Sequence, residues 1–286
     1  MNTYPDVLVR QSCDTGEGPL WHPDEQRIYW LDIPNSLLFR HRPKTGETET
    51  FDTGVPVGGM TLQSDGSLAL FMAEGAVRIW QDGAFVRTIL EEIVEERGNR
   101  FNDVIADPEG RVFCGVMSTE ARAGRLYRLD PNGDLTVMLE GTGTANGMGF
   151  SPDLTQMYFC DSRLRTLSVF DYERTTGALS NRRILLTPEG DEGKPDGMTV
   201  DAEGCLWSAR WDGARLVQLD SLGHELLRID FPVRNVSCVT FGGADYKDMF
   251  ITTARAGDAE KNGTLSGSLF HLNLGVQGRP EFRSAL

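Results

Sequence analysis

The feature that most constrains the fold is a pattern that occurs six times along the chain. Each copy has a short apolar run, a tight acidic or glycine-containing turn and a second apolar run, as in PLWHPDEQRIYWLD and MGFSPDLTQMYFCDS. One turn residue in each copy serves as an anchor: Asp24, Asp65, Glu109, Asp153, Glu203 and Ala244. These anchors are 41, 44, 44, 50 and 41 residues apart. A period in the forties with about four short strands in each repeat is typical of a β-propeller, in which each repeat forms one blade.

The repeat therefore predicts an all-β fold, a six-bladed β-propeller with four antiparallel strands in each blade. The N-terminal segment DVLVRQS has no repeat of its own. We expect it to pair with the last blade and close the ring, which removes two open strand edges. A pair of β-sandwiches does not explain the regular repeat, and we expect residues 1–286 to form one domain. FVRTILEEIVEER, from Phe85 to Arg97, fits either a short helix or a strand followed by an acidic loop.

Composition excludes some classes of partner. The net charge of −14 argues against nucleic acid, because binding nucleic acid needs a basic surface. No apolar run approaches the roughly 18–20 residues of a membrane span, and no export signal is visible at the N-terminus. The five cysteines are widely spaced, without a CxxC motif, and most adjoin apolar residues. We therefore expect buried, reduced thiols in a cytoplasmic protein without a membrane partner. A closed propeller is expected to be a monomer.

Polar residues recur at one position of the repeat, seven residues before the anchor. The residues at this position are Glu17, Gly58, Asn102, Asn146, Asp196 and Ser237. Equivalent positions in a propeller are related by rotation about the central axis, which the innermost strands line. We therefore expect the four longer polar side chains to meet at one mouth of the channel. A single Asn or Asp before a strand is more often a turn residue, but four at one phase of the repeat favour a common site.

The chemistry of this cluster indicates a cation site. Two carboxylates at close range repel each other unless a proton or a cation lies between them. Two carboxylates and two amide carbonyls form an all-oxygen set without Cys or His. Such a set suits Ca²⁺, Mg²⁺ or Mn²⁺ better than a structural zinc ion. The acidic composition of the chain is compatible with a bound cation.

The motifs that contain these residues resemble a known family. GEGPLW, NRFNDV, NGMGFSPD and PDGMTVD occur in the order and spacing of the SMP-30/gluconolactonase/LRE-like family, also called the regucalcin family. The resemblance extends from about Cys13 to about Gly257. It implies a six-bladed propeller that holds one divalent cation at the axial mouth and hydrolyses sugar lactones. Some relatives act on other lactones or on phosphoesters.

Carried over by motif, the resemblance also implies the metal ligands. The Glu of GEGP, the Asn of NGMGFSPD and the Asp of PDGMTVD are Glu17, Asn146 and Asp196, the three protein ligands of one divalent cation. Ca²⁺ is the expected ion, and Zn²⁺, Mn²⁺, Mg²⁺ and Fe²⁺ are the alternatives.

The resemblance implies substrate contacts as well. Arg100 and Asn102 in RFND match the pair that contacts substrate in the family, and Glu120 in GVMSTEA matches a glutamate that contacts sugar hydroxyls. The sequence departs from the family in two places. The loop STEARAG is shorter than in some relatives, which bears on Glu120, and Val104 stands where the family often has glycine.

The same residues suggest how a lactone, which is a cyclic ester, would be hydrolysed. The sequence has no GxSxG nucleophile elbow and no HExxH motif, and none of its four histidines lies at the recurring position. We therefore expect a metal to polarise the lactone carbonyl, with Asp196 as the general base that takes a proton from water and returns it to the leaving ring oxygen. In the alternative, a metal-bound hydroxide attacks and Asp196 only orients it.

Together these observations favour a metal-dependent, gluconolactonase-like enzyme whose partner is a small sugar lactone, converting an aldonolactone to an aldonic acid. One alternative is a related propeller hydrolase acting on non-sugar lactones, aryl esters or phosphotriesters. Another is a non-catalytic calcium-binding regulatory protein. Arg100 and Glu120 favour a polyol substrate, because an aryl substrate would need an apolar rim. Asp32 and Asp161 each end a second strand and are expected to be turn and packing residues, not a second metal site.

Overall fold

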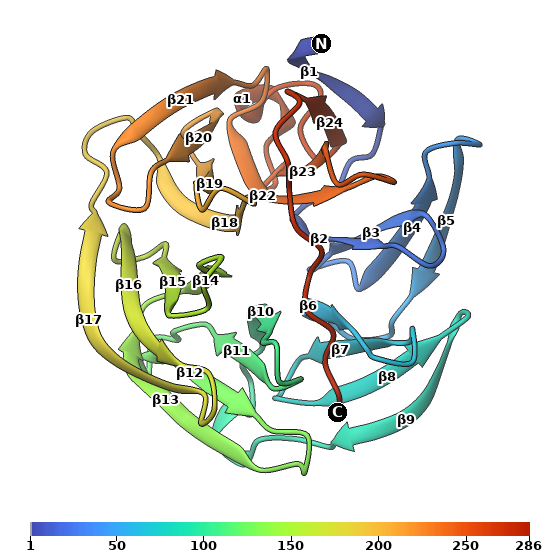
Figure 1. Ribbon diagram of the computed structural model, residues 1–286. Coiled ribbons are helices and arrows are strands. Elements are labelled where there is room, and N and C mark those ends of the chain that lie inside the picture. The colour runs from blue at the N-terminus through green and yellow to red at the C-terminus, as the bar shows by residue number, and fades with distance from the viewer. Residues whose placement is uncertain (1) are drawn as a thin grey trace.

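The structure, a computed structural model that describes residues 2–286, is a ring of six four-stranded antiparallel sheets (Figure 1). Each sheet is one blade, and the blades are numbered here in chain order. The predicted six-bladed β-propeller is confirmed, and the alternative of two β-sandwiches is wrong. The only helical segments within the described residues are a 3₁₀ turn at Val94–Glu96 and the short helix α1 (Ala259–Asn262).

The first five blades each take four consecutive strands. Blade 1 contains β2 (Gly16–His22), β3 (Arg27–Asp32), β4 (Leu37–Arg42) and β5 (Glu47–Asp52). Blade 2 contains β6 (Val57–Leu62), β7 (Leu68–Met72), β8 (Val77–Gln81) and β9 (Ala84–Leu90). Blade 3 contains β10 (Phe101–Ala106), β11 (Val112–Val116), β12 (Gly124–Leu129) and β13 (Leu135–Thr142). Blade 4 contains β14 (Ala145–Phe150), β15 (Gln156–Asp161), β16 (Thr166–Glu173) and β17 (Ala178–Leu186). Blade 5 contains β18 (Lys194–Val200), β19 (Leu206–Trp211), β20 (Arg215–Leu219) and β21 (Glu225–Asp230).

Blade 6 joins the two ends of the described chain. It contains β22 (Asn235–Gly242), β23 (Asp248–Ala254), β24 (Leu269–Asn273) and β1 (Asn2–Val9). Strand β1 pairs antiparallel with β24, with Val7 opposite Phe270. The ring is therefore closed by the N-terminal segment, as the absence of a repeat there predicted, and β24 keeps no free edge.

The apolar core lies between neighbouring blades. The first strand of each blade is innermost, and neighbouring inner strands contact one another around the whole ring. All six residues of β6 are buried, whereas five of the seven residues of β9, at the outer edge of the same blade, are exposed. One core cluster joins Tyr29 of blade 1 to Trp80 of blade 2, whose rings meet edge to face. Burial of such apolar layers is the main force that holds blades together.

The acidic segment Phe85–Arg97 follows the second of its two predicted conformations. Strand β9 ends at Leu90, and an acidic loop with a single 3₁₀ turn leads from it toward β10. Ile93 is buried in this segment, whereas Val86 and Val94 are exposed, so the segment does not present one continuous apolar face to the core, as a longer helix would. This loop carries Arg100 at its end and borders the mouth of the channel where the inner strands begin.

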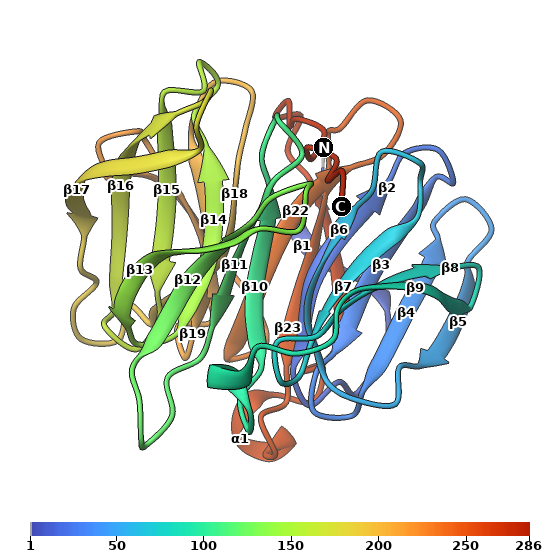
Figure 2. The ribbon, with the colours of Figure 1, turned by 90° about the horizontal axis from the view of Figure 1, so that it is seen from below.

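The opposite mouth is crossed by residues 276–286, called here the C-terminal strap, which Figure 1 shows in dark red. The strap touches one residue or more in every blade through hydrogen bonds, ion pairs or ring contacts. These include Asp24, Leu62, Gly110, Phe150, Ala202 and Tyr246, in blades 1 to 6 respectively. Figure 2 shows the strap at one end of the axis and α1 at the other. Within residues 2–286, no helix is long and apolar enough to span a membrane.

Candidate active site

The four polar residues at the recurring position lie around one cavity. Glu17, Asn102, Asn146 and Asp196 sit near the beginnings of β2, β10, β14 and β18 and all line a cavity of about 390 Å³. The strands enter the ring at this mouth, at the end of the axis opposite the C-terminal strap. The structure therefore brings together residues that are up to 179 positions apart, from 17 to 196 in the chain.

The two remaining positions of the set are small for steric and bonding reasons. A Cβ atom on Gly58 would lie 1.9 Å from the carbonyl oxygen of Phe101, so no larger residue fits in blade 2. In blade 6 the Ser237 hydroxyl donates a 2.6 Å hydrogen bond to the carbonyl oxygen of Gly16, beside Glu17. Blade 2 thus leaves space for the strand that carries Asn102, and blade 6 supports the strand that carries Glu17.

The glycines that follow Asn146 and Asp196 allow adjacent inner strands to approach closely. A Cβ atom on Gly147 would lie 2.5 Å from the Asp196 carbonyl oxygen. One on Gly197 would lie 2.2 Å from the sulfur of Cys238. Because both contacts involve atoms fixed in neighbouring strands, larger residues would push blades 4, 5 and 6 apart. The Asn-Gly and Asp-Gly pairs of the motifs are therefore a packing requirement of the mouth.

Asn146, Asp196 and Ser162 form a hydrogen-bonded group of three side chains. The Asn146 amide Nδ2 donates to the Ser162 hydroxyl at 3.0 Å and also to Asp196 Oδ1. The Ser162 hydroxyl donates to the carbonyl oxygen of Pro195 at 2.7 Å. The hydrogen bonds that Asp196 receives within residues 2–286 reach Oδ1, so Oδ2 is left for a cation or for water.

Two buried aspartates hold the segments that present these residues. Asp161 accepts hydrogen bonds from the backbone N–H of Gly143 at 2.8 Å and of Thr144 at 3.0 Å, just before Asn146. Asp32 accepts from the backbone N–H of Thr15 at 3.1 Å, just before Glu17. Both side chains are thus engaged with the backbone of their own blade, as expected for turn and packing residues.

The negative charge of the carboxylates in and beside the cavity is not fully balanced by nearby positive charge. Glu17 is 9% exposed and Asp196 is 4% exposed. Burial, followed by the nearby Asp103 carboxylate, raises the pKa of Glu17 to about 8. Burial, followed by the Glu17 and Asp103 carboxylates, raises the pKa of Asp196 well above its usual range. A cation between Glu17 and Asp196 would favour their charged forms and so oppose both shifts.

The donor set fits a hard divalent cation. Glu17 and Asp196 offer carboxylate oxygens, and Asn146 offers Oδ1, which also accepts a hydrogen bond from the Gly147 N–H at 3.1 Å. No group of three or more His, Cys, Asp or Glu side chains within residues 2–286 is placed to hold a metal ion. The amide oxygen of Asn146 would therefore have to complete the protein ligands. An all-oxygen set of this kind suits Ca²⁺, Mg²⁺ or Mn²⁺.

Arg100 and Asn102 form one unit on the wall of the cavity. Arg100 Nη1 donates to Asn102 Oδ1 at 2.9 Å and to the Phe101 carbonyl oxygen at 2.8 Å. Asn102 Nδ2 in turn donates to the carbonyl oxygen of Ala145 at 2.8 Å, which connects blade 3 to blade 4. The remaining guanidinium nitrogens of Arg100 can donate into the cavity.

Glu120 lies outside the central cavity. It is exposed at the tip of the loop after β11 and lines an adjoining cavity of about 360 Å³, which shares Arg163 with the central one. The central cavity is also lined by residues that the sequence interpretation did not select: Thr15, Met117, Thr144, Ser162, Arg163, Lys194 and Trp211. All of them lie just before or at the start of an inner strand, or at the end of or just after the second strand of a blade. Their positions in the repeat are therefore the signal that would have found them.

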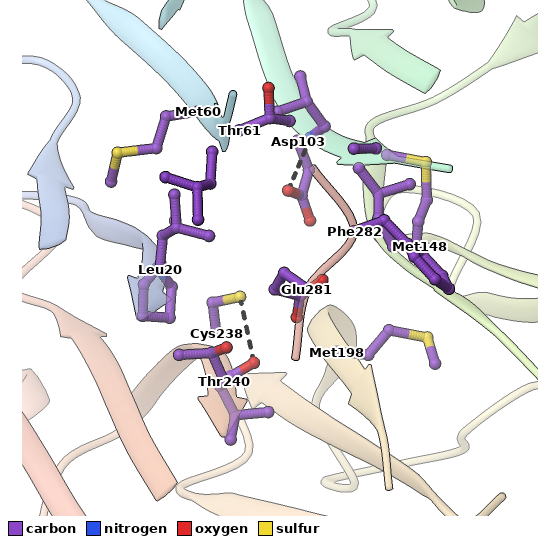
Figure 3. Close-up of a pocket in the computed structure, with 17 residues that line it drawn as sticks. Leu20, Met60, Thr61, Asp103, Met148, Met198, Cys238, Thr240, Glu281 and Phe282 are labelled. Carbon is purple, nitrogen blue, oxygen red and sulfur yellow. Dashed lines mark hydrogen bonds between the residues drawn. The ribbon is translucent and has the colours of Figure 1, made fainter. Parts of the chain in front are cut away.

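Below this site the channel narrows to a second cavity of about 60 Å³ (Figure 3). Asp103 and Glu281 of the C-terminal strap both line it. Burial raises the pKa of Asp103 to about 6. Burial, followed by the Asp103 carboxylate, raises the pKa of Glu281 to about 7. The axis of the ring therefore carries a column of carboxylates from the mouth toward the strap.

Comparisons with known proteins agree with the motifs. A profile of the SMP-30/Gluconolactonase/LRE-like region matches residues 15–255. Pentonolactonase XacC of Haloferax volcanii is 45% identical over 285 residues, which cover 97% of this chain and 97% of that protein. Regucalcin of Xenopus laevis is 32% identical, over 96% of this chain and 95% of its own. The crystal structure of the calcium-binding protein regucalcin from Agrobacterium tumefaciens has a TM-score of 0.90 at 26% identity, covering 98% of this chain and 97% of that one.

The profile spans most of the chain. The two curated relatives match this chain along nearly their whole length. The resemblance that the four motifs indicated is confirmed, and the chain belongs to the SMP-30/gluconolactonase/LRE-like family.

Proposed function

We propose that the protein is a metal-dependent lactonase that hydrolyses a sugar-acid lactone, converting an aldonolactone to an aldonic acid. The observation that carries the proposal is the convergence of two buried carboxylates and one amide oxygen on a cavity whose wall holds the Arg100–Asn102 unit. The names of similar proteins, pentonolactonase among them, support the same reaction class.

Glu17, Asn146 and Asp196 would hold one divalent cation. Ca²⁺ is the first candidate, because the donors are all oxygen and the related regucalcin of Agrobacterium tumefaciens is described as calcium-binding. Zn²⁺, Mn²⁺, Mg²⁺ and Fe²⁺ are the alternatives. When bound, the cation supplies Lewis-acid polarisation of the lactone carbonyl.

Asp196 would handle the proton. Its carboxylate takes a proton from the attacking water and returns it to the ring oxygen as the ester bond breaks. General acid–base catalysis of this kind contributes about 10²–10⁴-fold to the rate. The hydrogen bond from Asn146 Nδ2 to Oδ1 orients the carboxylate, and Ser162 Oγ, which accepts from the same Nδ2, positions Asn146. Ser162 and Asn146 thus orient the group that moves the proton.

Arg100, Asn102 and Glu120 would bind the substrate. The Arg100 guanidinium can donate to ring or carbonyl oxygens in the central cavity, and Asn102 holds it in place through a 2.9 Å hydrogen bond. Glu120 lies in the adjoining cavity and would accept hydrogen bonds from the hydroxyl groups of a substrate that extends into it. Polar donors and acceptors on both sides favour a polyhydroxylated lactone over an aryl ester or a phosphotriester.

The cell compartment and assembly form part of the proposal. Five free cysteines, four of them buried, support residence in the reducing cytoplasm. We propose a single-domain monomer with a small sugar lactone as its partner and without nucleic-acid or membrane partners. The net charge of −14 supports the absence of a nucleic-acid partner.

The test is a panel of glucono-, galactono-, xylono- and arabinonolactones, assayed by acid release with each candidate metal added separately. We expect metal-dependent turnover that falls at least about 10²-fold in Asp196→Asn. Asp201→Asn is the matched control. Asp201 is also buried and on blade 5, but it lies beyond the far end of β18 and accepts a hydrogen bond from Trp207 Nε1 at 3.0 Å.

The outcomes separate the alternatives. Turnover that survives chelation, or full activity in Asp196→Asn, would contradict the proposed mechanism. Tight Ca²⁺ binding without turnover of any lactone, aryl ester or phosphotriester would instead support a calcium-binding regulatory protein, which the acidic donor set and the regucalcin relatives favour as the second candidate.

A further inference from the structure

The two loops that carry Arg100 and Glu120 meet at one buried carboxylate, that of Glu96. Glu96 lies in the 3₁₀ turn after β9 and is fully buried. Its Oε1 accepts a hydrogen bond from the Tyr127 hydroxyl at 2.6 Å. Its Oε2 accepts from Asn99 Nδ2 at 2.8 Å and from Arg122 Nη2 at 2.5 Å. None of these groups has a place in the chemistry proposed above.

On one side, Glu96 fixes the segment that ends in Arg100. Asn99 uses the same Nδ2 to donate to the carbonyl oxygen of Met117 at 2.9 Å. Met117 lines the central cavity, and Arg100 directly follows Asn99 in the chain. A hydrogen-bonded path from the Glu96 carboxylate therefore reaches the residue directly before Arg100 and adds to the hydrogen bond that the Met117 N–H donates to the Arg100 carbonyl oxygen at 3.4 Å.

On the other side, Glu96 fixes the loop that carries Glu120. The Thr119 N–H donates to the carbonyl oxygen of Arg122 at 2.8 Å, and the Arg122 N–H donates to Thr119 Oγ1 at 3.1 Å. These bonds close a turn whose tip includes Glu120. The Arg122 guanidinium at the base of this turn reaches back to Glu96 Oε2 and to the carbonyl oxygen of Glu95.

A buried carboxylate adds little net stability, because the cost of desolvating it offsets most of the gain from its partners. What such a group does specify is geometry, since each bond has a preferred length and direction. Glu96 offers its two oxygens to three donors on three segments: the loop before β10, the loop after β11, and strand β12. Among these groups, the Glu96 side chain bonds both to the loop that ends in Arg100 and to the loop that carries Glu120.

We propose that Glu96 is a positioning residue for substrate binding, and that it sets the spacing between Arg100 and Glu120 across the central and adjoining cavities. The inference rests on the proposed lactonase function and deepens it. Glu96 does not touch the substrate. It acts through Asn99 on Arg100 and through Arg122 on the Glu120 turn, so its loss weakens the binding of a polyhydroxylated lactone more than it slows the chemical step at Asp196.

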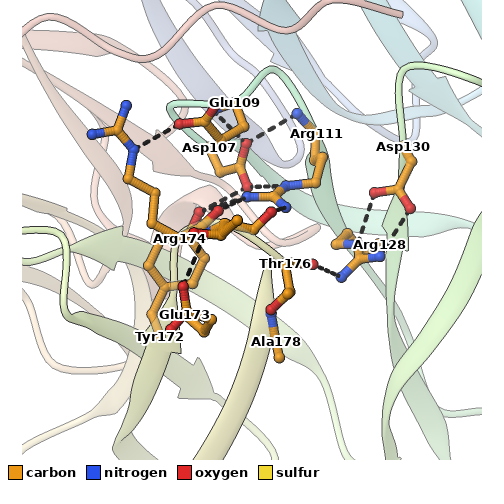
Figure 4. A network of polar contacts seen from close by, with 11 residues as sticks. Asp107, Glu109, Arg111, Arg128, Asp130, Tyr172, Glu173, Arg174, Thr176 and Ala178 are labelled. Carbon is orange, nitrogen blue, oxygen red and sulfur yellow. Dashed lines mark hydrogen bonds and ion pairs between the residues drawn. The ribbon is translucent and has the colours of Figure 1, made fainter.

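The sharpest test compares two tyrosines. Tyr127→Phe removes the hydroxyl that donates to Glu96. Tyr172→Phe removes an equivalent hydroxyl, which donates to the buried Asp107 carboxylate at 2.8 Å and belongs to the network shown in Figure 4. That network also includes the ion pair between Asp107 Oδ2 and Arg111 Nε at 2.5 Å. Asp107 follows the inner strand β10, at the strap end of the axis, so both variants lose one hydrogen bond to a buried carboxylate, at opposite ends of the ring.

We expect Tyr127→Phe to raise the lactone KM about 5–20-fold with kcat changed less than about 2-fold, which is the pattern of lost binding. Tyr172→Phe should lower Tm by about as much as Tyr127→Phe does, but it should leave the lactone KM unchanged. Glu96→Gln should raise KM at least as much as Tyr127→Phe. In combination with Arg122→Gln its effect should be less than additive, because both act on one bond.

Each outcome decides between the ideas. An unchanged KM in Tyr127→Phe, or an equal rise in KM in both tyrosine variants, would overturn the positioning role. A kcat loss without a KM change would also overturn it. If Glu96→Gln fails to fold, the tyrosine pair still decides the question. Failure of the wild-type chain to turn over any lactone would remove the proposed function itself, whereas wild-type turnover with an unaffected Tyr127→Phe variant removes only the role of Glu96.

Discussion

Replacing Glu281 with glutamine should stabilise the protein at alkaline pH. Glu281 lies on the C-terminal strap and faces the small channel cavity together with Asp103, while Arg279 on the same strap gives partial compensation. Burial and the Asp103 carboxylate raise the pKa of Glu281 from 4.5 to about 7. Ionisation of this group in the folded state is therefore unfavourable relative to the unfolded chain.

The sign of the pH dependence follows from the direction of the shift. Because the pKa of Glu281 is higher in the folded state, the folded protein binds this proton more tightly. The contribution of the group to stability is complete below pH 4.5 and is lost as the pH rises through about 7. The full shift corresponds to about 3 kcal/mol, and solvent reaching the half-buried side chain reduces the expected effect to about 1–2 kcal/mol.

Urea unfolding at pH 4.5, 6, 7 and 8, in saturating Ca²⁺, measures the effect. Glu281→Gln and the wild type should have the same free energy of unfolding at pH 4.5, and the variant should be more stable by about 1–2 kcal/mol at pH 8. Glu203→Gln, which removes an exposed carboxylate near the same end of the axis, is the control and should change nothing. A variant that is less stable at pH 8, or a difference that does not vary with pH, would refute the reasoning.

Two further changes test the two ends of the channel. Glu17→Gln should lower the Ca²⁺ affinity measured by calorimetry at least about 10-fold, because it removes one of the two carboxylates from the ligand set. The far-ultraviolet circular dichroism spectrum should stay that of the wild type. An unchanged Kd would exclude Glu17 as a ligand. Phe282→Ala should reduce the free energy of unfolding by about 2–3 kcal/mol, because Phe282 packs on Phe150 in the core beneath the strap. The lactone KM should stay unchanged. A shift in KM would mean that the two mouths are coupled.

The repeat contains most of the information about the fold. Six copies of one strand pattern predict six blades, and the segment without a copy predicts the closing strand β1. The convergence of Glu17, Asn102, Asn146 and Asp196 also follows. Residues at the same position of each repeat are related by rotation about the axis, so they meet at the same mouth of the channel. The need for glycine at position 58 does not follow, because it depends on the approach of the Phe101 carbonyl from the next blade.

Other parts of the site could not be predicted for physical reasons. Glu96 and Arg122 lie in connecting loops outside the repeat pattern, and only the path of those loops brings them within 2.5 Å. Glu120 is assigned by its motif, but the direction of its loop places it in the adjoining cavity. The strap sequence VQGRPEFRSAL has no strand alternation, since many of its partners are backbone groups at the turns of different blades. Its position therefore has no signature in local sequence.

The closure of blade 6 has a consequence for how the protein is made. Strand β1 has no partner until β24, some 260 residues later, has been synthesised, since Val7 pairs with Phe270. The first five blades can assemble as they emerge from the ribosome, because each is local in sequence. Until β24 is made, β1 is an unpaired strand, open to association with other chains. The ring therefore closes only once β24 is available, and β1 has to stay free of other partners until then.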